Sequence, residues 1–131
     1  RRSIYFFIKR SQLIPTMMLF DWPEHLVSIG RRSTTTIAPQ ALMFMNSPQG
    51  RRIAESLYEQ VVALESKDKL EQLFLRCYGR PPSEQEARIS LQFLQKQTKA
   101  YSSEALNDTE NRVWIDLCQT LLSSSEFIYI D

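Results

Sequence analysis

The chain has 131 residues, of which 43% are apolar and 24% are charged, and its formal net charge is +1. This composition is typical of a globular protein and excludes the polar, highly charged class of disordered chains. No segment approaches the about 20 apolar residues of a membrane span, and the start lacks the order of features of a secretory signal. We expect one folded domain over residues 1–131, and since Arg1 stands where a Met would begin a protein, a C-terminal fragment of a longer one.

The near-neutral total hides an uneven distribution of charge. Residues 1–52 contain eight Lys or Arg and two acidic residues, a net charge of +6, whereas residues 53–131 contain eight basic and thirteen acidic residues, a net charge of −5. Six of the first eight positive charges form arginine doublets: Arg1 with Arg2, Arg31 with Arg32, and Arg51 with Arg52. Guanidinium groups bind carboxylates or phosphates through paired hydrogen bonds. We favour the acidic helices of the same molecule as their partner, then another protein, and nucleic acid least, because no basic helix or stacking motif supports it.

Residues 1–38 are predicted to form an extended arm. The short apolar and β-branched run at residues 4–8 favours a strand or extended chain. Prolines and Gly30 interrupt the segment that follows, in which only residues 15–20 favour a helical turn. The many bulky apolar side chains of residues 9–38 predict that this arm packs across the helices.

Residues 39–131 are predicted to form a helical bundle, and its first two helices each begin at a proline. Pro39 suits the first position of a helix that runs to about residue 46, with Leu42, Phe44 and Met45 buried. Ser47 and Pro48 begin the next helix, expected to run to residue 64. Its predicted buried stripe is formed by Ile53, Leu57, Val61 and Leu64, and is widened by Ala54, Tyr58 and Val62.

Three further helices are predicted from capping signals and apolar spacing. The third spans residues 67–78 and ends at Gly79, and the fourth spans residues 84–101 after a capping box of Ser83 and Glu86. The fifth spans residues 109–124. The predicted core side chains of the last two are Ala87, Leu91 and Leu94, then Val113, Trp114, Leu117, Leu121 and Leu122. The fold class is therefore all-α, a bundle of about five helices. The apolar residues 127–130 are expected to dock on the rest of the domain, and one arrangement is a short strand that pairs with residues 4–8.

The sequence contains few groups for catalysis or for binding a metal or cofactor. His25 is the only histidine, and Cys77 and Cys118 lack the spacing of a zinc or haem site, so we expect buried free thiols, with a disulfide as the alternative. Three glycines form no phosphate-binding loop. We therefore expect no catalytic residue, metal or cofactor in this fragment. The candidate interface or ligand-contact residues are Asp21, His25, Arg31, Arg32 and Gln40.

Five sequence blocks resemble a known family. They are RRSIYFFIKR, LFDWPE, RRSTTTIAPQALMFMNSP, LFLRCYGRPPSEQE and LCQTLLSSSEFIYID, in this order along the whole chain. Together they resemble the C-terminal domain of unknown function of large planctomycete proteins, which commonly also carry a cytochrome-c-like domain. The resemblance implies an extracytoplasmic location, periplasmic or secreted, and places any haem in another domain. It assigns no catalytic or ligand-binding role to a residue of this chain.

These observations favour a non-catalytic structural or interaction domain at the C-terminus of a multidomain protein. Residues 1–46 would contact the preceding domain of the same polypeptide, and another protein is a second expected partner. Two alternatives remain at this level. One is a composite enzyme site, for example for a polysaccharide, to which the candidate contact residues contribute beside another domain. The other is weak nucleic-acid binding through the arginine doublets.

Overall fold

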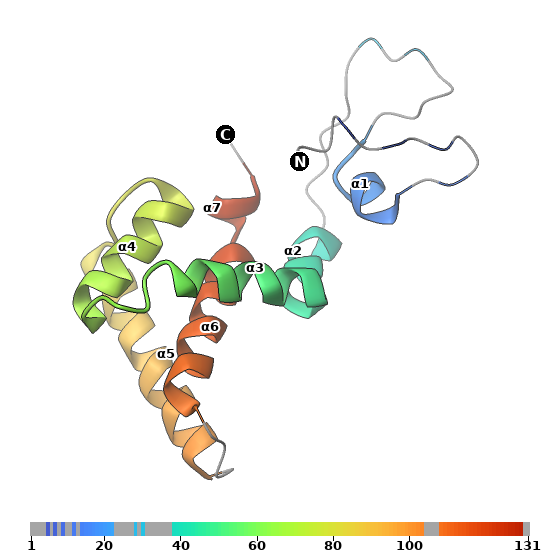
Figure 1. The fold of residues 1–131 in the computed structure, drawn as a ribbon. Helices are drawn as coiled ribbons and strands as arrows, with labels where there is room; N and C mark the ends of the chain where they lie inside the picture. Colours follow the sequence, from blue (N-terminus) through green and yellow to red (C-terminus); the bar gives the residue numbers. More distant parts are fainter. Residues whose placement is uncertain are drawn as a thin grey trace. The chain divides into compact units, whose positions relative to one another are not determined.

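The computed structural model describes Tyr5, Phe7, Lys9, Gln12, residues 14–22, Ser28, Gly30, residues 38–103 and residues 108–129. The chain divides into two compact units, Arg1–Gln40 and Ala41–Asp131. The described residues contain seven helices and no strand, so the predicted all-α class is confirmed (Figure 1).

The first unit contains one short helix, α1 (Pro15–Leu19), which confirms the helical turn expected there. Proline at its start and backbone bonds from Phe20 and Trp22 to the Met17 carbonyl define its ends. The strand expected at residues 4–8 is not seen at Tyr5 and Phe7, and the other three residues of that run lie outside the described part. Tyr5 and Phe7 are 73% and 89% exposed.

Helices α2 (Ala38–Asn46) and α3 (Pro48–Glu59) meet at a sharp corner, and both begin as their prolines predict. The Ser47 hydroxyl accepts a hydrogen bond from the Gly50 amide at 3.0 Å, which caps α3. A Cβ atom at Gly50 would collide with the Phe44 carbonyl, so only glycine permits this close approach. Of the three side chains expected to be buried in α2, Phe44 packs on the core, whereas Leu42 and Met45 are half exposed.

Helix α3 differs from its predicted length and buried face. It ends at Glu59, five residues early, and successive turns lead to Leu64. Ala54, Tyr58 and Val61 are buried, whereas Ile53 is 47% exposed and Leu64 is also exposed. The centre of the buried face is thus rotated by about one residue, towards the side chains expected at the edge of the stripe. The reason is that α3 lies across helix α6 (Thr109–Leu122), and the small Ala54 side chain allows the two helices to approach closely.

Helices α4 (Ser66–Tyr78) and α5 (Glu84–Ser103) follow their capping signals closely. Gly79 ends α4 in the left-handed region, at φ 72°. The Ser83 amide donates to Glu86 at 2.7 Å and the Glu86 amide donates to the Ser83 hydroxyl at 3.3 Å, so the capping box is confirmed. On α5, Ser90 is buried and Leu91 is 48% exposed, which corrects the predicted stripe.

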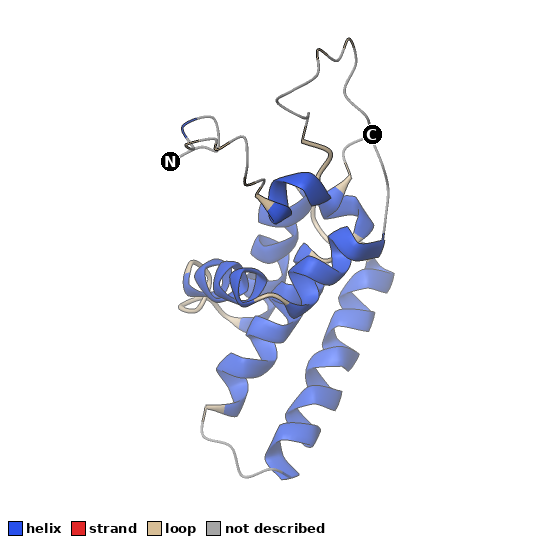
Figure 2. Ribbon diagram, turned by 90° about the vertical axis from the view of Figure 1, so that its right-hand side faces the viewer, coloured by secondary structure: helices blue, strands red, loops and turns tan. Residues whose placement is uncertain are grey.

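Helix α6 (Thr109–Leu122) is the centre of the second unit and packs on α3, α4, α5 and the last helix, α7 (Ser125–Ile128). Its five predicted core side chains are all buried, as is Cys118. In Figure 2, α5 and α6 form the long antiparallel pair. The chain end expected as a strand is a helical turn instead, because the Ser124 hydroxyl accepts from the Phe127 amide and caps it. Phe127 docks on the core, as expected for the tail.

Candidate binding site

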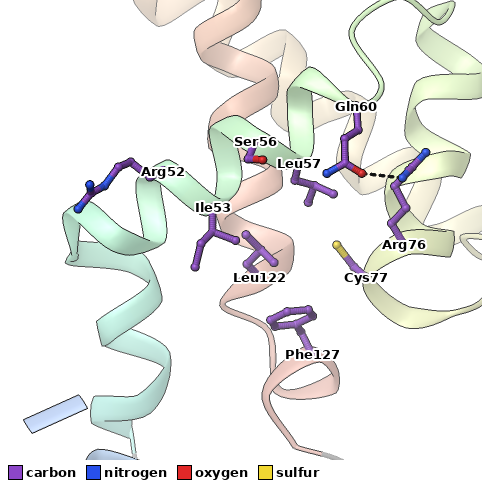
Figure 3. Close-up of a pocket in the computed structure, with 9 residues that line it drawn as sticks. All are labelled: Arg52, Ile53, Ser56, Leu57, Gln60, Arg76, Cys77, Leu122 and Phe127. Atoms are coloured by element: carbon purple, nitrogen blue, oxygen red, sulfur yellow. Dashed lines mark hydrogen bonds between the residues drawn. The ribbon is translucent and has the colours of Figure 1, made fainter. Parts of the chain in front are cut away.

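The second unit has an open pocket of about 360 Å³ where α3, α4, α6 and α7 meet (Figure 3). It is lined by nine residues: Arg52, Ile53, Ser56, Leu57, Gln60, Arg76, Cys77, Leu122 and Phe127. Volumes of this size are at the lower end for ligand sites and suit one or two large apolar side chains.

The floor of the pocket is apolar and firmly held. Leu122 is a buried core residue, and Leu57, Cys77 and Phe127 pack directly on the core. Ile53 is nearly half exposed, because the rotation of α3 turns it out of the core and makes it a wall of the pocket. The pocket is therefore a preformed apolar surface and not a gap between loosely packed helices.

Two arginines lie at opposite ends of this floor, Arg52 on α3 and Arg76 on α4 (Figure 3). Neither forms an ion pair with a carboxylate of the described residues. Arg76 donates one hydrogen bond to the Gln60 side chain at 2.7 Å, which orients its guanidinium group and leaves its other donors for a ligand. The pocket thus combines an apolar floor with positive charge at each end.

The wall formed by α7 is fixed by an arginine and a tyrosine from the end of α4. Arg80 donates to both Glu86 oxygens and both Glu126 oxygens, at 2.7 to 2.9 Å. The Tyr78 hydroxyl contacts the Ser124 hydroxyl at 2.9 Å and donates to the Leu121 carbonyl at 3.1 Å. Since Ser124 caps α7, these contacts determine where Phe127 is placed.

The only thiol in the pocket, Cys77, is poorly suited to nucleophilic chemistry. Burial raises the pKa of Cys77 to about 11, so the thiolate that would attack a substrate is scarce near neutral pH. Cys118 is fully buried, and burial raises its pKa to about 12. Both thiols are free, in agreement with the expectation of free thiols over a disulfide.

A separate polar cluster on α6 holds α2 and α3 in place. Arg51 donates to one Asp116 oxygen at 2.5 Å, and the Tyr101 hydroxyl donates to the other at 2.6 Å. Gln119 donates to the Phe44 and Met45 carbonyls at the end of α2. Arg51 thus lies over an acidic helix of the same molecule, as favoured for the doublets, whereas its neighbour Arg52 does not.

The structure describes two of the five candidate contact residues. Asp21 follows α1 in the left-handed region, at φ 56°. Gln40 is 2% exposed and donates to the Leu19 carbonyl at 2.9 Å, so it joins the start of α2 to the end of α1. His25, Arg31 and Arg32 lie outside the described residues. Neither Asp21 nor Gln40 lines the pocket.

Within the described part of the chain, no helix is long and apolar enough to cross a membrane. The same residues contain no group of three His, Cys, Asp or Glu side chains arranged to bind a metal ion.

Comparison with known proteins gives one match. The model of the family described as "PSD1: Protein of unknown function (DUF1553)" matches residues 1–94, more than half of the chain. The chain belongs to the PSD1 family. No curated protein and no solved structure matches it significantly.

The matched part of this PSD1 chain includes the pocket residues of α3 and α4, whereas Leu122 and Phe127 lie beyond it. The pocket was not predicted from the sequence as a site, although Ile53, Leu57 and Leu122 were predicted to be core residues. The signal that could have found it is the position of Arg52 and Arg76 on helices whose neighbouring residues are apolar. It was not decisive, because arginines on exposed helix faces are common.

Proposed function

We propose that this PSD1 chain is a non-catalytic interaction domain that binds another protein through the pocket between α3, α4, α6 and α7. The observation that carries the proposal is the exposed Ile53 beside a preformed apolar floor. Ile53 extends the apolar floor to the surface, and a continuous apolar surface with polar residues at its rim is typical of a site that another protein covers.

The chemistry of the pocket supports binding over catalysis. No histidine or carboxylate is among the nine described residues that line it. Ser56 therefore has no general base beside it there, and the raised pKa of Cys77 keeps that thiol protonated.

The resemblance extends the proposal to the whole protein. We place this domain in a multidomain extracytoplasmic protein of planctomycete type, in which residues 1–46 contact the preceding domain. The strong exposure of Tyr5 and Phe7 supports a contact surface in this front segment.

Site-specific photo-crosslinking in the cell that produces the protein tests the interaction. A photoreactive amino acid at Ile53 should form one discrete adduct with a protein, identified by mass spectrometry, because this position lies in the proposed contact. The same amino acid at Lys96, an exposed position on α5, is the control and should give no such adduct. Equal labelling from both positions, or none from position 53 while the thermal midpoint is unchanged, contradicts the proposed function.

A further inference from the structure

We infer that the partner presents a peptide segment in which one or two large apolar side chains are flanked by carboxylates. This inference rests on the proposed function and specifies the chemistry of the occupant. It follows from the charges at the ends of the pocket, from its size and from the way in which Arg76 is held.

Arg52 and Arg76, at the two ends of the pocket, differ from two nearby arginines in having no carboxylate partner among the described residues. Arg51, next to Arg52 on α3, is neutralised by Asp116, and Arg80, just after α4, is neutralised by Glu86 and Glu126. Arg52 and Arg76 have no such partner among the described carboxylates. The positive charge at each end of the floor is therefore available to an acidic ligand, and electrostatic complementarity of this kind determines specificity at interfaces.

Arg76 is also positioned in advance. Its bond to Gln60, the C-cap residue of α3, reduces the side-chain freedom that binding would remove. Only Nη1 of Arg76 is engaged in this bond, so the Nε and Nη2 edge of its guanidinium still offers the paired donors that a carboxylate accepts.

Two separated charges favour a peptide over a fatty acid. A fatty acid has a single carboxylate and could satisfy only one end, whereas a peptide can carry acidic residues on both sides of an apolar anchor. The floor accommodates that anchor between Ile53 and Phe127. Phe127 already packs edge-to-face on Phe44, with ring centroids 6.0 Å apart, so it serves as a wall and is not a free stacking platform for a nucleic-acid base.

The test is selection from a displayed random dodecapeptide library on the 131-residue chain, followed by affinity measurement of the enriched peptides as synthetic probes. We expect enriched peptides to contain Leu, Phe or Met flanked by Asp or Glu. Replacing the acidic residues of a probe by their amides should weaken binding about tenfold, as should raising the salt concentration, because the contacts are exposed ion pairs. Bound peptide should also protect Cys77 from alkylation.

Two double variants of equal charge locate the site. Arg52→Glu with Arg76→Glu should weaken peptide binding by at least about tenfold. Arg88→Glu with Arg112→Glu makes the same change in net charge at two exposed arginines outside the pocket and should leave the affinity within about twofold. Ile53→Ser should abolish binding, and an unchanged circular dichroism spectrum and thermal midpoint verify the fold of each variant.

Five outcomes would overturn the inference. Enriched peptides without acidic residues, or equal effects of the two double variants, would remove the carboxylate requirement and leave the proposed function in place. No enrichment, or preferential binding of a fatty acid in the same protection assay, would rule out this peptide class, and the crosslink from position 53 would then decide the proposed function alone. If the unaltered chain self-associates and the Ile53→Ser variant does not, a second copy of the chain is the occupant of the pocket.

Discussion

At the scale of single residues, burial and pairing decide which side chains are available for chemistry. Lys69 is 4% exposed, and its ammonium lies 4.9 Å from the centroid of the Trp114 ring and 5.4 Å from that of Tyr58. Its alkyl chain therefore fills core space while the charge rests on two aromatic faces. Nothing in the local sequence distinguishes Lys69 from Lys67, which is exposed on the same helix.

The two cysteines give a prediction at this scale. In the native chain, iodoacetamide should modify one thiol, Cys77, since Cys118 is fully buried. The rate should rise about tenfold for each pH unit from 7 to 10, because the pKa of Cys77 is near 11 and the thiolate is the reacting form.

Mass spectrometry of the alkylated chain measures this. Cys77→Ser should abolish labelling of the native chain, and denaturation of the unaltered chain should expose two thiols. A rate that levels off near pH 9 would show an ordinary thiol and contradict the structure.

At the scale of helices, capping and ion pairing connect elements that are distant in sequence. Glu86 closes the capping box of α5 and, through Arg80, is linked to Glu126 on α7. A single carboxylate therefore supports both the start of one helix and the wall of the pocket formed by another.

This connection predicts a dependence of stability on pH. Hydrogen bonds from Arg80, then from the Ser83 amide and hydroxyl, lower the pKa of Glu86 to about 2, from an ordinary value of 4.5. Because the folded-state pKa lies below the unfolded value, the stabilisation is complete above pH 4.5 and is lost as the pH falls towards 2.

Thermal unfolding at pH values from 2 to 7 tests this with Glu86→Gln. The variant should have a lower midpoint than the unaltered chain at pH 7, and the difference should shrink below pH 4.5. Glu84→Gln, an exposed acid in the same first turn, is the control and should change little. A constant difference across the pH range would argue against the ionised Glu86 as its cause.

At the scale of the whole molecule, the core cluster of the described residues lies in the second unit. Every buried apolar residue of the core cluster lies at or after Ala54, in the second unit, and α6 contributes five of the eleven. The folded state of Ala41–Asp131 thus draws its apolar stabilisation from its own helices.

We therefore predict that residues 38–131 fold without the residues that precede them. Deleting residues 1–37 should preserve the helical circular dichroism signal and shift the thermal midpoint by less than about 4 °C, which corresponds to under about 1 kcal/mol for a domain of this size. The deletion removes the Leu19 carbonyl that Gln40 contacts, so a small loss is expected. A matched deletion of α7, which removes Phe127 from the core, should cost clearly more. Loss of cooperative unfolding on deleting residues 1–37 would show that the first unit supports the second.

The sequence by itself determined where most of the helices begin, because the signals are local. Pro48 after a capping serine, Gly79 at a left-handed helix end, and the capping box of Ser83 and Glu86 all act within one turn. The central helix α6 was also evident, since a helix packed on several sides shows its apolar face clearly. Only the tertiary structure decided which face of α3 and of α5 is buried. An apolar stripe two residues wide permits several rotations of a helix about its axis, and the helix that packs against it selects one. On α5 that choice buries Ser90 and exposes Leu91. On α3 it buries Ala54 and exposes Ile53, which becomes a wall of the pocket. The site was not apparent in the sequence for the same reason: its walls come from four helices, and which arginines are left without a carboxylate depends on how those helices pack.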